Sequence, residues 1–152
     1  MTPDLISKHV VVDRLDWISR MVEVIHALPL NDPEYFFADE RNLMTAESGL
    51  RRALEALFDL GRHILAKGFG EGVSEYREIA VKLKEHKILT QKDAELLISL
   101  AGYRNRLVHF YHEVGAEELF DICSTGLVDL ERIVQAYRLW LKANPERMDD
   151  GL

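Results

Sequence analysis

The chain has 152 residues, of which 47% are hydrophobic, and this length and composition suit one globular domain with a substantial core. Its formal net charge of −7 excludes a general nucleic-acid coat protein, because such proteins bind the phosphate backbone through clustered lysine and arginine. No segment has the roughly 18 uncharged apolar residues of a membrane-spanning helix, and the N-terminus lacks a signal-peptide pattern. Cys123 is the only cysteine, which excludes an intrachain disulfide, so we expect a protein of the reducing cytoplasm.

Apolar residues at helical spacing dominate the first half of the chain. Thr2-Pro3 and Asp32-Pro33 each have the pattern of a helix N-cap followed by proline at the first helical position. We therefore predict a first helix over about 3–28 and a long second helix from about 33 or 40 to 67. The stretch "KGFGEG", residues 67–72, has G-x-G-x-G spacing, but no strand precedes it as a phosphate-binding loop would require. We expect a flexible connection there.

The second half continues the helical pattern. Ser74 is expected to cap a short helix over about 75–86, and Thr90 with Asp93 resembles a capping box at the start of a helix over about 91–111. Gly115 breaks that pattern, and a last helix is expected over about 116–143, before a frayed tail at 144–152. Neither strand-like alternation nor an internal repeat is present. The sequence therefore predicts an all-α bundle of about five helices in a single domain, 1–152.

The helix expected over about 91–111 has an apolar arc wider than half of its circumference. At about 100° per residue, Arg104 and Asn105 fall inside this arc and His109 falls at its edge. Arg106 falls on the opposite face, which is expected to be solvated. An arc this wide predicts burial on two sides, against the bundle and against a second subunit. Residues 101–112 also form a local basic island without an acid, which any RNA-directed activity would have to use.

A buried guanidinium at Arg104 is costly unless it has an anionic or polar partner. One interpretation is structural: an ion pair with Glu47 or Asp59, or capping of the last helical carbonyls. The other is a cleft in which Arg104, Asn105 and His109 meet a phosphate. The residues alone leave both interpretations open. Structural ion pairs are common, and they perturb the pKa values of ionisable groups as functional sites do.

The stretch "RNRLVHFY" resembles the R-N-x-x-x-H-x-Y signature of HEPN-domain proteins, in particular HepT-like toxins. It places Arg104, His109 and Tyr111 at the motif positions, with Asn105 directly after the arginine, and the resemblance covers residues 5–142. The resemblance implies a HEPN-type helical bundle and a homodimer in which the motifs of two subunits meet. It also implies the toxin of a type VII-like toxin–antitoxin system, a ribonuclease without metal or other cofactor, and a minimal nucleotidyltransferase antitoxin as partner.

The family resemblance implies a role for each motif residue in RNA cleavage. RNA carries its own nucleophile, the 2′-hydroxyl. An imidazole, whose unperturbed pKa is about 6.5, can take or give the required proton at neutral pH. This role is expected of His109. Arg104 would stabilise charge on the phosphate oxygens, and Asn105 would orient His109 or donate to phosphate. The expected product is a 2′,3′-cyclic phosphate. The antitoxin is expected to neutralise the toxin by transferring AMP from ATP onto the Tyr111 hydroxyl.

Two alternatives compete with this hypothesis. His109, His112 and Glu113 have the i, i+3 and i+4 spacing that would place three metal ligands along one helix. A non-catalytic HEPN module, which binds a nucleotide or a protein partner, would keep the same motif for structure.

Overall fold

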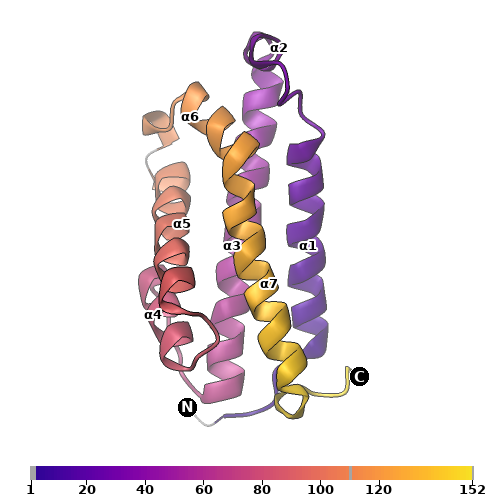
Figure 1. Cartoon of the computed structure of the whole chain (residues 1–152), viewed down its shortest axis with the longest axis vertical. Coiled ribbons are helices and arrows are strands. Elements are labelled where there is room, and N and C mark those ends of the chain that lie inside the picture. The colour runs from indigo at the N-terminus through magenta and orange to yellow at the C-terminus, as the bar shows by residue number, and fades with distance from the viewer. Residues whose placement is uncertain (1–2, 110, 152) are drawn as a thin grey trace.

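The computed structural model describes residues 3–109 and 111–151. Every named secondary-structure element within these residues is a helix (Figure 1). The α-helices are α1 (Lys8–His26), α2 (Pro33–Ala38), α3 (Glu40–Phe69), α4 (Tyr76–Glu85), α5 (Gln91–His109), α6 (Ala116–Asp121) and α7 (Leu127–Ala143). Two 3-10 helices, η1 (Tyr111–Glu113) and η3 (Pro145–Arg147), and a π-helical turn, η2 (Ile122–Gly126), complete them. The expected all-α bundle is confirmed. No helix within the described residues is long and apolar enough to cross a membrane.

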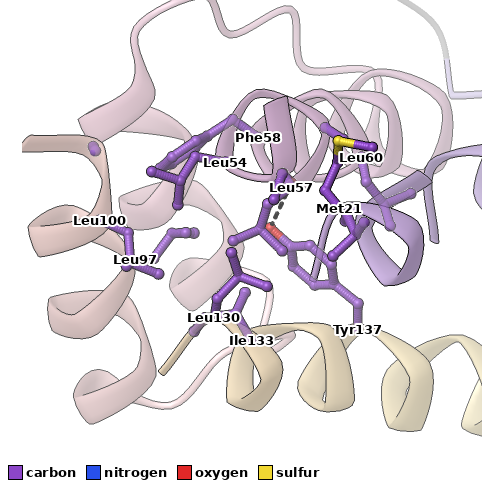
Figure 2. Close-up of a cluster of buried hydrophobic side chains, with 14 of the residues drawn as sticks. Met21, Leu54, Leu57, Phe58, Leu60, Leu97, Leu100, Leu130, Ile133 and Tyr137 are labelled. Carbon is purple, nitrogen blue, oxygen red and sulfur yellow. Dashed lines mark hydrogen bonds between the residues drawn. The ribbon is translucent and has the colours of Figure 1, made fainter. Parts of the chain in front are cut away.

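The central helix of the bundle is α3, which packs against every other α-helix. Figure 2 shows its buried leucines and Phe58 facing apolar side chains of α5 and α7. The buried Tyr137 of α7 donates its hydroxyl hydrogen to the carbonyl oxygen of Leu57, at 3.4 Å. A Cβ at Gly61 would lie only 2.7 Å from that hydroxyl, so the missing side chain at Gly61 lets α7 approach α3 closely.

Both ends of the chain differ from the prediction. The first helix begins at Lys8, with Ser7 as its N-cap, because Ile6 pairs with the C-terminal tail instead of starting a helix near residue 3. The amide of Ile6 donates to the carbonyl of Arg147 at 2.8 Å, and its carbonyl accepts from the amide of Asp149 at 3.0 Å. The tail predicted to fray is therefore hydrogen-bonded to the N-terminal segment over residues 147–149, a pairing between distant residues that local sequence patterns do not reveal.

Asp32 caps α2 as predicted, with Pro33 at the first helical position. α2 then ends before Asp39, which caps the separate helix α3. The two predicted starting points of one long helix, at about 33 and 40, are therefore the starts of two helices. The predicted loop at 67–72 is wrong in its first half, because α3 continues through Phe69. It ends at Gly70, whose left-handed backbone (φ 69°) closes the helix.

The caps of α4 and α5 are confirmed in part. No side chain of the described residues caps α4, and the N-cap position is Glu75 instead of the predicted Ser74. The hydroxyl of Thr90 accepts from the amide of Asp93 at 3.1 Å, as predicted for the start of α5. The carboxylate of Asp93 does not complete a capping box. It accepts from Arg132 Nε of α7 at 2.7 Å and so ties α5 to α7.

The helix predicted over 116–143 is helical along its whole length, but its hydrogen-bonding pattern changes within it. It consists of α6, the π-helical turn η2 and α7. Within η2 the hydroxyl of Thr125 donates to the carbonyl of Asp121 at 2.9 Å, and Cys123 is buried. A π-helical turn inserts a residue into the helical register, which turns the apolar face of α6 relative to that of α7.

Candidate active site

Arg104 lies at the centre of a layered contact between three helices. Its guanidinium carbon lies 4.7 Å from the ring centre of Tyr76, at the start of α4. The Tyr76 ring stacks in turn on the buried Phe58 of α3, with ring centres 4.6 Å apart and planes 16° apart. The Arg104 side chain is only 18% exposed. The prediction that Arg104 lies on a buried face of its helix is therefore confirmed, and aromatic rings provide the surface on which it lies.

The charge of Arg104 is balanced by Glu55 of α3. Its Nη2 lies 3.6 Å from Glu55 Oε1, and Nη1 donates to the side-chain oxygen of Asn105 at 3.5 Å. The predicted partners Glu47 and Asp59 are wrong. Asp59 pairs with Arg62 instead, one turn further along α3. Local spacing could not identify Glu55, because the contact joins residues 49 positions apart in the sequence.

The hydrogen bonding of Arg104 is incomplete in the described structure. Its Nε is buried and has no acceptor among the described residues. A buried donor without an acceptor costs about 1–3 kcal/mol. The ion pair with Glu55 is also long, at 3.6 Å, and Glu55 is shared with Arg51 Nη1 at 3.4 Å. The guanidinium is thus held in place by packing, and its terminal nitrogens, with contacts of 3.6 Å to Glu55 and 3.5 Å to Asn105, retain hydrogen-bonding capacity for a further oxygen ligand.

Asn105 and His109 lie on the outer side of α5. Both are exposed, they are one helical turn apart, and His109 is the last residue of the helix. Arg104 and His109 are five positions apart, which corresponds to a rotation of about 140° around the helix axis. The structure therefore brings Asn105 to Arg104, while the Arg104 guanidinium packs into the bundle and the His109 imidazole is exposed at the helix end.

The helical wheel predicted that Arg106 is solvated, but the structure pairs it with a carboxylate. Its Nη1 and Nη2 donate to the two carboxylate oxygens of Glu118 in α6, at 2.6 and 2.9 Å, and Nη2 also donates to the carbonyl of Glu113 at 3.3 Å. The hydrogen bond from Arg106 lowers the pKa of the Glu118 carboxyl. This bidentate pair links the end of α5 to α6 across the segment that contains the motif tyrosine.

Tyr111 follows α5 as the first residue of η1, and its side chain lies outside the part of the chain that the structure describes. The helix predicted to reach residue 111 ends at His109, so His109, His112 and Glu113 do not follow one α-helix as the metal alternative requires. No group of three potential metal ligands occurs among the described residues.

A groove of about 670 Å³ opens beside Arg104, between α4 and α5. Its lining comes from Arg62 of α3, the segment before α4, the first turn of α4, and one face of α5: Arg62, Ser74, Glu75, Tyr76, Arg77, Ile98, Ala101, Gly102, Arg104 and Asn105. Two predicted motif residues, Arg104 and Asn105, thus border an open space large enough for a nucleotide.

Three comparisons place this geometry among known proteins. The family model described as "Ribonuclease HepT-like" matches residues 17–137. The tRNA nuclease HepT of Aphanizomenon flos-aquae is 27% identical over 142 residues, which cover 92% of this chain and 95% of that protein.

Two solved structures share the fold. The tri-AMPylated HEPN toxin of Shewanella oneidensis, in complex with MNT antitoxin, aligns with a TM-score of 0.77 and 22% identity over 86% of this chain and 97% of the toxin chain. YutE from Bacillus subtilis, a cytosolic protein of unknown function, aligns with a TM-score of 0.73 and 19% identity over 88% and 90%. These likenesses confirm the HEPN-type fold.

Proposed function

The chain belongs to the HepT-like ribonuclease family, and we propose that Arg104 and His109 form its RNA-cleaving site. The observation that carries the proposal is the state of Arg104. The guanidinium is fixed by Tyr76 and Glu55, while its terminal nitrogens make only long contacts, 3.6 Å to Glu55 and 3.5 Å to Asn105, beside an open groove. A planar donor group of this kind suits the oxygens of a phosphate.

In the proposed reaction the 2′-oxygen of one nucleotide attacks the adjacent phosphorus, and the bond from phosphorus to the leaving 5′-oxygen breaks. His109 takes the 2′-hydroxyl proton or gives a proton to the 5′-oxygen, the proton-transfer role that imidazole side chains most often have in catalysis. Arg104 stabilises the charge that accumulates on the non-bridging oxygens. Asn105 is adjacent to Arg104 and one turn from His109, so it orients one of them. The products are a 2′,3′-cyclic phosphate and a 5′-hydroxyl.

We propose a homodimer in which two copies of α5 complete one cleft. Arg104 and His109 diverge by about 140° around the helix axis. The histidine of a second copy can therefore face a phosphate bound at Arg104 more readily than the histidine of the same chain. The reaction also needs both a general base and a general acid, and two copies supply two imidazoles.

The proposed partner is a minimal nucleotidyltransferase antitoxin that adenylylates Tyr111 and thereby neutralises a toxin. Support comes from the solved neighbours, which include a tri-AMPylated HEPN toxin in complex with MNT antitoxin. Tyr111 lies two positions after His109, in η1 beyond the end of α5. A phosphodiester there would add negative charge near Arg104 and His109 and repel RNA. The tRNA nuclease relative makes tRNA the first substrate to test.

The catalytic proposal predicts that His109→Ala and Arg104→Ala each lower the rate of tRNA cleavage by about 10²- to 10⁴-fold, the usual contribution of such groups. Arg138→Ala is the control, because Arg138 is an exposed arginine of α7 and lies outside the α4–α5 groove. Denaturing gels would measure the rates. A composite site further predicts that mixing the two inactive variants restores part of the activity, because a mixed dimer keeps one Arg104 and one His109 in the shared cleft. Equal loss in all three variants would contradict the assignment of Arg104 and His109, and no cleavage by the wild type would favour the non-catalytic module.

The control proposal predicts that Tyr111→Phe still cleaves RNA but escapes the antitoxin, because it keeps the ring and lacks the acceptor oxygen. Mass spectrometry of the wild type, incubated with antitoxin and ATP, should detect adenylyl mass on the peptide that contains Tyr111. Modification confined to Tyr103 would refute this assignment while leaving the nuclease site intact.

A further inference from the structure

The groove beside Arg104 extends away from the motif towards α4. Beyond Arg104 and Asn105, its apolar lining comes from Ile98, Ala101 and Gly102 of α5. A Cβ built on Gly102 would meet no heavy atom within 4 Å, so the space above this residue is open. Gly102 is also exposed. The lining therefore presents an apolar strip of α5, exposed mainly at Ile98 and Gly102, next to the guanidinium of the proposed site.

More basic than acidic side chains line the groove, although the whole chain carries −7. Arg62, Arg77 and Arg104 contribute to its lining, against one acidic residue, Glu75. Arg62 is already engaged by Asp59 and by the carbonyls of residues 73 and 74. Arg77 is exposed and forms no ion pair within the described part of the chain. Arg77 is thus the cation of this groove that remains available to a ligand.

We propose that this groove binds the RNA strand that leads away from the cleaved phosphate. The inference rests on the proposed ribonuclease site and adds a substrate-binding surface to it. Arg77 pairs with a flanking phosphate, and a base packs against the apolar strip at Gly102. A basic groove with apolar surfaces for the bases is the arrangement by which proteins bind single strands without reading their sequence. The volume of about 670 Å³ accommodates a nucleotide unit.

The test measures binding separately from cleavage. In a His109→Ala background, fluorescence anisotropy follows a labelled single-stranded RNA oligonucleotide of mixed sequence over a series of salt concentrations. Arg77→Gln should lower the slope of log affinity against log salt by about 0.7, the value for one lost phosphate contact on a single strand. Gly102→Glu should weaken binding about tenfold or more, because it adds bulk and negative charge to the groove. Its open surroundings leave the fold intact, which circular dichroism checks.

The matched control is Arg138→Gln, an exposed arginine of α7 that should leave the affinity and the slope unchanged. In the active background, Arg77→Gln should raise KM for tRNA cleavage and leave kcat unchanged, as expected for a contact made equally before and during the reaction. Wild-type binding and KM in both groove variants, or an equal effect of Arg138→Gln, would overturn the groove assignment.

The two proposals fail in different ways. If RNA binding depends on the groove residues but cleavage does not depend on Arg104 and His109, the proposed function is overturned and the RNA-binding groove stands. Cleavage that depends on Arg104 and His109, with binding unaffected by Arg77→Gln and Gly102→Glu, would overturn the groove alone.

Discussion

Arg104 is held by two side chains that the motif does not contain. Tyr76 lies under its guanidinium at 4.7 Å, and Glu55 lies 3.6 Å from Nη2. A guanidinium–ring contact contributes about 0.5–1 kcal/mol when exposed and about 2 kcal/mol when desolvated. Tyr76→Leu should therefore lower the rate of RNA cleavage by about 2- to 30-fold, measured as kcat on tRNA. Tyr76→Phe keeps the ring and should remain close to the wild type.

A double-mutant cycle distinguishes positioning of Arg104 from general destabilisation. If Tyr76 acts only through Arg104, then Tyr76→Leu should cause no further loss of rate in an Arg104→Ala background. Additive losses in the double variant would show that Tyr76 acts through the stability of the bundle or through direct contact with RNA. Thermal unfolding of each variant provides the stability measurement that this comparison needs.

At the scale of the elements, α5 and α6 are joined by Arg106 and Glu118. Both side chains are about one third exposed, so solvent screening keeps the contribution of this pair to stability small despite its bidentate geometry. Its consequence concerns η1, which lies between the two helices and begins with Tyr111. We predict that Arg106→Ala and Glu118→Ala cause the same change in the rate of tRNA cleavage and of adenylylation, because each breaks the same link.

The matched control for this pair is charge reversal. Arg106→Glu combined with Glu118→Arg should restore part of what either single reversal loses. A loss of cleavage in Arg106→Ala, with Glu118→Ala like the wild type, would instead indicate that Arg106 contacts RNA directly. Separate rate measurements on each variant decide between these outcomes.

The elements that sequence patterns predicted well are those set by local chemistry. The cap at Asp32 and the start of α5 after Thr90 each depend on residues within one turn. The prediction failed where distant residues decide, as at Ile6, which pairs with Met148, and at Arg104, whose partner is Glu55 of α3. The helical wheel identified the burial of Arg104 but misplaced Arg106, because the position of α6 is a tertiary feature.

For the whole molecule, the N-terminal segment connects α3 to the C-terminal tail. His63 of α3 accepts the amide hydrogen of Ser7 through Nε2 at 3.0 Å, and Asp4 donates its amide to the carbonyl of Lys67 at 2.6 Å. On the other side Ile6 pairs with the tail. His63 must be unprotonated at Nε2 to accept this hydrogen bond, so its titration is coupled to the docking of both ends of the chain.

The pKa of His63 is lowered in the folded protein, first by burial and then by the positive charges of Lys67 and Arg14. Asp149 opposes this effect. Because the folded pKa lies below the unfolded value of about 6.5, the unfolded chain binds more protons between the two values, and stability rises with pH there. The contribution of His63 is complete above the unfolded pKa and is lost as the pH falls through the folded pKa.

We therefore predict that the free energy of unfolding, measured by urea titration, decreases from about pH 7.5 to about pH 5.5, within the range where histidine titrates. His63→Gln keeps a side-chain acceptor near Ser7 without a titrating ring, so it should flatten this dependence. His9→Gln, at an exposed position of α1, is the matched control and should retain the wild-type slope. An unchanged slope in His63→Gln would assign the pH dependence to another group. A slope of opposite sign in the wild type would contradict the lowered pKa of His63, because a raised folded pKa makes the protein more stable as the pH falls.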